Sequence, residues 1–262
     1  MTIAPESAMT PALSLKRISK NYGGLEVLSE VSFVVPQGSI FGLAGPNGAG
    51  KTTLLNIVSG FDVANSGSKS VMGHDATKMD ALSLSKVGVA RTFQNIRLFK
   101  GLTVREQVNA GAYRHRQASI IAGMIGLRSQ RTDNNVTQGM TEEALAFVGL
   151  SDSADLLAEN LSYGDQRRVE ISRAMATKPS LLLLDEPTAG MNEADWMPIA
   201  DLLQRLRRQG TTIVVIEHNM RLIERICDEI VVIAAGAVIA QDEPQRCLRL
   251  PQVRLAYFGK SS

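Results

Sequence analysis

The stretch GPNGAGKT, from Gly45 to Thr52, decides the fold of this chain. It matches the pattern G-x-x-x-x-G-K-[ST] in full, with the apolar run SIFGLA before it and the helical pattern TLLNIVSG after it. Glycines let backbone N–H groups approach a phosphate closely, and the N-terminus of the following helix adds a favourable dipole. The stretch therefore predicts a strand, a phosphate-binding loop and a helix, which together begin an α/β nucleotide-binding fold.

Two side chains of this stretch have expected roles of their own. Lys51 is expected to reach the β- and γ-phosphates, and Thr52 to bind Mg²⁺ through its hydroxyl. The residues that we expect to contact the nucleotide here are Gly45, Pro46, Asn47, Gly48, Ala49, Gly50, Lys51, Thr52 and the following Thr53.

Composition indicates a folded, soluble protein. Of the 262 residues, 44% are hydrophobic and 21% charged, and a net charge of +2 gives no reason to expect nucleic acid as a partner. The two cysteines, Cys227 and Cys247, form no CxxC pair and are expected to be reduced thiols. Residues 1–11 lack the features of a signal peptide and are expected to be a flexible tail. The apolar runs 120–127 and 230–240 are too short to span a bilayer.

The order of patterns along the chain predicts the architecture. Alternating segments such as LSLKRIS and VLSEVSFVV, separated by turn residues, predict an antiparallel sheet at the start. Helical patterns dominate from about residue 102, with the polar stretch RSQRTDNN between two helices, and indicate an inserted helical subdomain at about 102–165. Afterwards SLLLLD and TTIVVIE predict buried strands with a helix between them, and EIVVIAAGAVIAQD predicts a hairpin. We expect a single domain over residues 12–262.

A second phosphate-site element follows the strand Leu181–Leu184. Asp185 at its end is placed to lie beside a bound Mg²⁺, and Glu186 is a candidate general base for an attacking water. His218 follows the next apolar strand. A lone histidine at a strand end is more often structural, but parallel strands present their carboxyl ends to one crevice. This favours a functional role in which His218 hydrogen-bonds the γ-phosphate or positions the water.

Three further segments have two interpretations each. Gln94, between aromatic residues in RTFQNIRLF, is a loop residue or a site residue. Tyr22, before two glycines, is a turn aromatic or a platform on which a base stacks. In ENLSYGDQRR, Ser162 and Asp165 form the capping pattern [ST]-x-x-[DE], while Leu-Ser-x-Gly before a basic helix is typical of half a nucleotide site.

Taken together, these elements resemble the ABC ATPase family over nearly the whole chain. In the family's terms they are the aromatic A-loop at Tyr22, the Walker A motif Gly45–Thr52, the Q-loop at Gln94, the signature Leu161–Gln166, the Walker B motif Leu181–Glu186, the D-loop Ala189–Asn192 and the switch histidine His218. The segments ARTFQNIRLFKGLTV, LSYGDQRRVEI, LLLLDEPTAGMN and LAYFG look most like ATP-binding subunits of high-affinity branched-chain amino-acid importers.

The resemblance implies a fold and a mechanism. The fold is a P-loop NTPase with a RecA-like core, an N-terminal antiparallel β-subdomain and an inserted helical subdomain. ATP and Mg²⁺ are the implied cofactors, with Thr52, Gln94 and Asp185 as metal ligands and with Glu186, His218 and Gln94 as catalytic residues. Two ATPase subunits would close head-to-tail, so that Ser162 and Gly164 of one chain grip the ATP held by the other.

The resemblance also implies partners and a location. The second ATPase subunit is expected to be a different chain, with a homodimer left open. Two transmembrane permease subunits and, indirectly, a periplasmic or extracellular solute-binding protein complete the transporter. The chain would lie peripherally on the cytoplasmic face of the inner membrane, and the segment NIRLF would help to form a groove for the permease.

The sequence departs from the family pattern at three positions. Asp165 stands where glutamine is usual in the signature, so its charge is expected to weaken ATP binding at the partner's site. Asn192 and Tyr163 replace the more general aspartate and glycine, as they do in the importer subgroup. The basic segment Arg114–Arg131 is longer than a minimal subdomain needs, and is either a solvated helix pair or a contact to the permease or to anionic lipids.

Three alternatives to amino-acid import fit parts of the sequence. An ATPase for urea or short amides would have the same architecture. A soluble ABC ATPase for cluster assembly is argued against by FQNIRLF, which fits a permease groove. A degenerate, regulatory chain is argued against by the presence of both Glu186 and His218.

Overall fold

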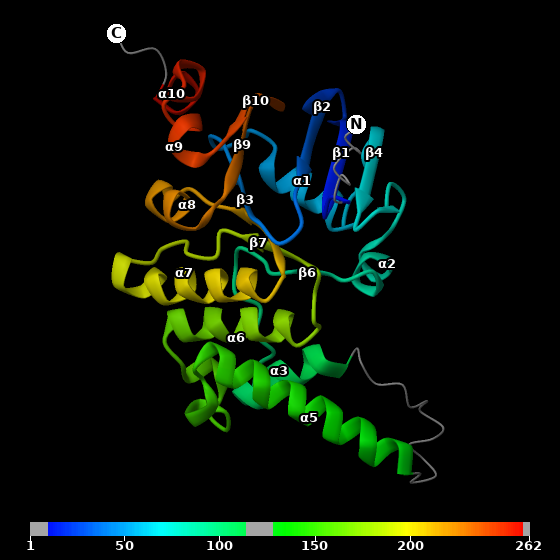
Figure 1. The fold of residues 1–262 in the computed structure, drawn as a ribbon, viewed down its shortest axis with the longest axis vertical. Coiled ribbons are helices and arrows are strands. Elements are labelled where there is room, and N and C mark those ends of the chain that lie inside the picture. The colour runs from blue at the N-terminus through cyan, green and yellow to red at the C-terminus, as the bar shows by residue number, and fades with distance from the viewer. Residues whose placement is uncertain (1–9, 114–127, 259–262) are drawn as a thin grey trace, which may run out of the picture.

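The computed structural model describes residues 10–113 and 128–258 (Figure 1). Most of the predicted tail over residues 1–11 and most of the basic segment 114–131 lie outside the described residues. The strands form two sheets, one mixed and one antiparallel, and helices surround the mixed sheet.

The mixed sheet forms the core of the molecule. Its strands lie in the order β10 (Ala237–Asp242), β9 (Glu229–Ala234), β3 (Ile40–Ala44), β8 (Thr212–Ile216), β7 (Leu181–Asp185) and β6 (Val89–Arg91). The pairings from β9 to β6 are parallel, and β10 pairs antiparallel with β9, which confirms the predicted hairpin. Every residue of β3, β7 and β8 is buried, as their continuous apolar sequences predict for strands covered on both faces.

The antiparallel sheet confirms the prediction for the start of the chain. Its order is β2 (Leu25–Val35), β1 (Leu13–Tyr22), β4 (Ser66–Val71) and β5 (His74–Asp75). It shares one hydrophobic cluster with β3 and with α1 (Lys51–Val58), in which the rings of Phe33 and Phe41 stack 5.5 Å apart. The phosphate-binding loop therefore lies between the two sheets, close to Val27 of β2 and Ile233 of β9.

A layer of helices lies below the core sheet in Figure 1. It contains α3 (Val104–Ala112), α5 (Arg128–Val148) and α6 (Tyr163–Met175), with short 3₁₀ turns at Ser151–Ser153 and Ala158–Asn160. A capping box between Thr103 and Glu106 starts α3. The division of the chain into a core and an inserted subdomain at about 102–165 stays a prediction, but the helices of this layer all lie between 104 and 175.

The start of α5 differs from the sequence prediction. The stretch RSQRTDNN was expected to separate two helices, whereas the helix begins at Arg128 and includes it. The eight residues include neither glycine nor proline, so none of them breaks the helix. Buried apolar residues near the end of the helix, such as Leu145 and Val148, anchor it to the rest of the protein.

The remaining helices cover the core sheet and the end of the chain. They are α2 (Ala81–Lys86), α7 (Glu193–Arg208), α8 (Met220–Ile226), α9 (Pro244–Cys247) and α10 (Pro251–Phe258). Asn192 caps α7 by accepting from the backbone N–H of Asp195. Both cysteines are free, and burial raises the pKa of the Cys247 thiol to about 11. None of the helices in the described part of the chain has the length and hydropathy of a membrane-spanning segment.

Candidate active site

The phosphate-binding loop joins β3 to α1, and its shape requires glycine at two positions. Gly45 and Gly50 have φ of 148° and 97°. A Cβ at Gly45 would lie 2.1 Å from the carbonyl oxygen of Ile233, and one at Gly50 would lie 2.8 Å from that of Val27. In the described part of the chain, no side chain caps the N-terminus of α1. The first N–H groups of the helix therefore remain for a ligand, as an anion site at a helix N-terminus needs.

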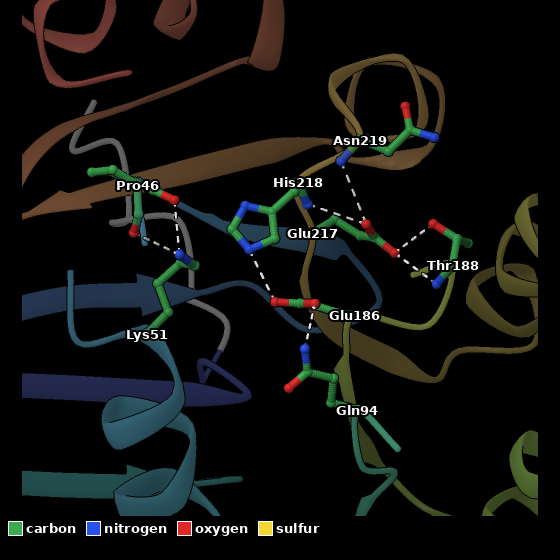
Figure 2. A network of polar contacts seen from close by, with 9 residues as sticks. Pro46, Lys51, Gln94, Glu186, Thr188, Glu217, His218 and Asn219 are labelled. Atoms are coloured by element: carbon green, nitrogen blue, oxygen red, sulfur yellow. Dashed lines mark hydrogen bonds and ion pairs between the residues drawn. The ribbon is translucent and has the colours of Figure 1, made fainter. Parts of the chain in front are cut away.

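Lys51 lies across this loop. Its ammonium donates to the carbonyl oxygens of Gly45 at 2.8 Å and Pro46 at 2.9 Å (Figure 2). Burial lowers the pKa of Lys51, and the nearby carboxylates Glu186 and Asp185 act in the opposite direction. The ammonium is therefore held at the place where phosphates would bind, by weak acceptors that an anion can replace.

A cavity of about 230 Å³ opens beside the loop and brings distant segments together. It is lined by Val27, Asn47, Gly48, Ala49, Gly50, Lys51, Thr52, Thr53, Glu186 and His218. The last two follow β7 and β8, which are neighbours in the parallel sheet with Asp185 opposite Ile216. The carboxyl ends of parallel strands thus deliver both side chains to the phosphate-binding loop, as the sequence predicted.

Glu186 is the centre of this arrangement (Figure 2). One oxygen of its carboxylate accepts from Gln94 Nε2 at 2.8 Å, and the other lies 2.9 Å from His218 Nε2. Because an ionised carboxylate is an acceptor, His218 donates from Nε2 in this contact. Glu186 also has φ of 47°, a left-handed conformation that is uncommon outside glycine and is enriched at functional sites.

Asp185 ends β7 and is buried beside Glu186. Burial raises the pKa of its carboxyl, while Arg91 at 3.1 Å acts to lower it. The Thr52 hydroxyl, the Asp185 carboxylate and the Gln94 amide are oxygen donors of the kind Mg²⁺ prefers. Among the described residues no group of three or more histidine, cysteine, aspartate or glutamate side chains could hold a metal. The donor set fits Mg²⁺, which keeps waters and takes substrate phosphates as its other ligands.

Glu217 is a buried residue for which sequence reasoning gave no role. Its carboxylate accepts from the backbone N–H of Thr188 at 2.9 Å, from the Thr188 hydroxyl at 2.7 Å and from the backbone N–H of His218 at 3.1 Å (Figure 2). It therefore ties the loop after Glu186 to the loop that carries His218. The signal was present in the sequence as a carboxylate at the end of an apolar strand, directly before the histidine.

The sequence of this chain matches a known protein family. Residues 28–189 match the sequence profile of the ABC transporter family. The chain belongs to the ABC transporter family. The resemblance predicted from the motifs is thereby confirmed.

Relatives of this ABC ATPase include transport proteins similar over almost their full length. The high-affinity branched-chain amino acid transport ATP-binding protein BraF of Pseudomonas aeruginosa is 35% identical over 96% of this chain and 99% of its own. The protein LivG of Escherichia coli, with the same description, is 34% identical over the same shares.

Solved structures confirm the predicted α/β ABC ATPase fold. A nucleotide-free ATP-binding cassette of an ABC transporter superposes with a TM-score of 0.83 at 29% identity, covering 96% of this chain and all of that one. The ADP conformation of an ATP-binding cassette gives 0.82 at 29% identity with the same coverage.

The A-loop residue Tyr22 lies at the end of β1, outside the lining of the phosphate cavity. Its hydroxyl donates to the Asp62 carboxylate, which also accepts from Lys20 at 2.6 Å. The hydrogen bond to Asp62 raises the pKa of Tyr22. The ring is 46% exposed, with the Lys20 ammonium 4.8 Å from its centroid. Its stacking on a base stays a prediction.

The signature residues lie at the N-terminus of α6 and not in the lining of the cavity. Ser162 caps the helix by accepting from the backbone N–H of Asp165 at 3.2 Å, as expected. The second half of the predicted capping box is wrong, because the Asp165 carboxylate pairs with Arg168 one turn along the helix. That pairing offsets the charge that was expected to face a phosphate.

Proposed function

We propose that this chain hydrolyses ATP to drive import of branched-chain or related amino acids through a membrane permease. The observation that carries the ATPase assignment is the meeting of Gln94, Glu186 and His218 at the cavity lined by the phosphate-binding loop. The names of the full-length relatives support the transported solute.

Each side chain of the site has a proposed role in hydrolysis. The loop N–H groups and Lys51 hold the phosphates, and Glu186 takes a proton from the water that attacks the γ-phosphorus. His218 donates to a γ-phosphate oxygen as the bond to the leaving ADP breaks. Mg²⁺ held by Thr52, Asp185 and Gln94 would neutralise charge on the phosphate oxygens. Gln94 and His218 both hydrogen-bond Glu186, and in the proposed reaction they also reach Mg²⁺ and the γ-phosphate, so we expect these contacts to change when ATP binds.

The signature supports a second ATPase subunit as partner. Gly164 is helical, yet a Cβ placed there would meet nothing within 4 Å. Among the described residues no contact therefore explains a glycine at a position where alanine would favour a helix by about 1 kcal/mol. An approach by a ligand from outside the chain explains it. The Ser162 hydroxyl accepts from the backbone N–H of Asp165 and could donate its own hydrogen to the same ligand. A heterodimer is proposed, with the homodimer as the alternative.

Gly164→Ala tests this arrangement. We expect the variant to fold with unchanged or higher stability and to lose ATPase activity by about tenfold or more, because a methyl group blocks the partner's γ-phosphate. Gly139→Ala is the matched control, since Gly139 lies in α5 and a Cβ there also meets nothing. Equal activity of the two variants, measured with the assembled ATPase pair, would refute the proposed role of Gly164.

A groove between the core and the helical layer supports the permease as a partner. A cavity of about 330 Å³ lies there, lined by residues that include Phe61, Phe93 and Phe99. Phe99 is 55% exposed, and Arg173 lies 5.2 Å from its ring centroid. Exposed aromatic rings around a concave site are typical of a surface that receives an apolar helix from another protein. Peripheral binding to a membrane follows from such a contact.

Co-purification tests the transport assignment. The chain, expressed with its native membrane, should recover a permease, and Phe99→Glu should lose it because a charge then faces the apolar groove. Leu255→Glu is the matched control, because Leu255 is 49% exposed on α10, away from the groove lining. Recovery of soluble partners alone by the unmodified chain would contradict a transporter function. The solute is identified by ligand screening of the associated solute-binding protein.

A further inference from the structure

Arg91 forms an ion pair with the Walker B aspartate that the sequence did not indicate. It is the last residue of β6, at the edge of the parallel sheet beside β7. Its guanidinium donates to Asp185 Oδ2 at 3.1 Å, and both side chains are only 6% exposed. An ion pair this deeply buried is costly to break from one side, because the remaining charge is left without compensation.

The same guanidinium is fixed by other contacts to the helix that follows the phosphate-binding loop. Its second terminal nitrogen donates to Asn56 Oδ1 and to Ser59 Oγ, both at 2.8 Å. Asn56 belongs to α1 and Ser59 caps its C-terminus. Arg91 therefore links Asp185, the Walker B carboxylate, to the C-terminal end of α1. The N-terminus of the same helix faces the phosphate site.

The guanidinium of Arg91 also lies beside two aromatic rings of the groove described above. The guanidinium carbon lies 5.0 Å from the ring centroid of Phe93 and 5.6 Å from that of Phe61. Both rings and Arg91 line the cavity of about 330 Å³. Phe93 directly precedes Gln94, whose side chain donates to Glu186. Arg91 therefore contacts both Asp185 and the segment that places Gln94 at Glu186.

We propose that Arg91 is a positioning residue, whose guanidinium holds the Asp185 carboxylate in place until a nucleotide and its Mg²⁺ arrive and ties that carboxylate to the groove wall at Phe61 and Phe93. The proposal rests on the assignment of Asp185 to Mg²⁺ in the proposed function. Arg91 supplies the positive charge that the buried carboxylate needs while no cation is bound. Once a cation lies beside Asp185, the guanidinium becomes partly redundant there.

The test compares the melting temperature of Arg91→Met with that of the unmodified protein under two conditions. With ADP and EDTA, the variant should melt lower by roughly 5–10 °C, because Asp185 is left as an unpaired buried charge. With ADP and saturating Mg²⁺, at least half of that deficit should disappear, since the cation compensates Asp185 in place of Arg91.

Two further variants sharpen the comparison. Arg97→Met is the matched control, because Arg97 lies 4.2 Å from the same Phe93 ring and has no bond to Asp185, so it should show no deficit that depends on Mg²⁺. Arg91→Lys keeps a positive charge but cannot reproduce the fork of hydrogen bonds. It should show a smaller deficit with the same dependence on Mg²⁺, and it serves in place of Arg91→Met if that variant does not fold.

The outcomes separate this proposal from the function on which it rests. A deficit that is equal with and without Mg²⁺, or one that Arg97→Met shares, overturns the role of Arg91 and leaves the assignment of Asp185 standing. Asp185→Asn should lose the part of the ADP-induced stabilisation that depends on Mg²⁺. If it keeps that part, Asp185 is not the ligand, and the proposal for Arg91 fails with it.

Discussion

Glu186→Gln is expected to bind ATP with near-normal affinity and to hydrolyse it about 10²–10⁴-fold more slowly. The amide cannot accept the proton of the attacking water, whereas the phosphate-binding loop and Lys51 are unchanged. ATP that is bound and not hydrolysed should hold two ATPase subunits together. Steady-state phosphate release measures the first effect, and size-exclusion chromatography with ATP and Mg²⁺ measures the second.

The hydrogen bonds around Glu186 predict a second effect of this substitution. The carboxylate accepts from both Gln94 and His218, but an amide offers a single oxygen to two donors. The amide NH₂ then faces one of the two partners, and His218 can keep its contact by accepting from that NH₂ at Nε2, so we expect the substitution to change the tautomer of His218. Glu193→Gln is the matched control, since Glu193 pairs with Arg221 at 3.1 Å on the exposed start of α7. Hydrolysis by Glu186→Gln at a rate close to that of the control would exclude Glu186 as the base.

The parts of the fold and site that the sequence predicts are those with local or periodic signals. The phosphate-binding loop has a fixed pattern of glycines, and β7 and β8 have continuous apolar runs that require burial on both faces. Because parallel strands end at one edge, the positions of Asp185, Glu186 and His218 follow from their places after those runs. Their proximity to Lys51 needed no knowledge of long-range packing.

The features that the sequence did not predict depend on which partner a side chain finds. Asp165 had two acceptable partners, the backbone N–H at the helix start and an arginine one turn on, and the structure pairs it with Arg168. Arg91 and Asp185 are distant in the chain and meet because β6 adds to the edge of the sheet beside β7. A three-residue strand carries too little pattern for its pairing to be read from sequence.

Lys51→Met should weaken ATP binding by about 10–100-fold, which corresponds to the loss of a hydrogen bond between charged groups worth roughly 1.5–3 kcal/mol. The positive φ angles of Gly45 and Gly50 should remain, although the carbonyl oxygens of Gly45 and Pro46 lose the ammonium that donates to them. Titration with a fluorescent ATP analogue measures the affinity. Lys78→Met, at an exposed loop position, is the control and should bind normally.

The pH dependence of binding distinguishes a charge contact by Lys51 from a packing effect. Burial lowers the pKa of Lys51, so its ammonium loses its proton at a lower pH than an exposed lysine does. A bound phosphate favours the charged form and raises that pKa again. ATP affinity of the unmodified protein should therefore fall as pH rises through the lowered pKa, with a proton taken up on binding. In Lys51→Met this decline should be absent, and a variant that keeps the same decline would show that another group titrates at the phosphates.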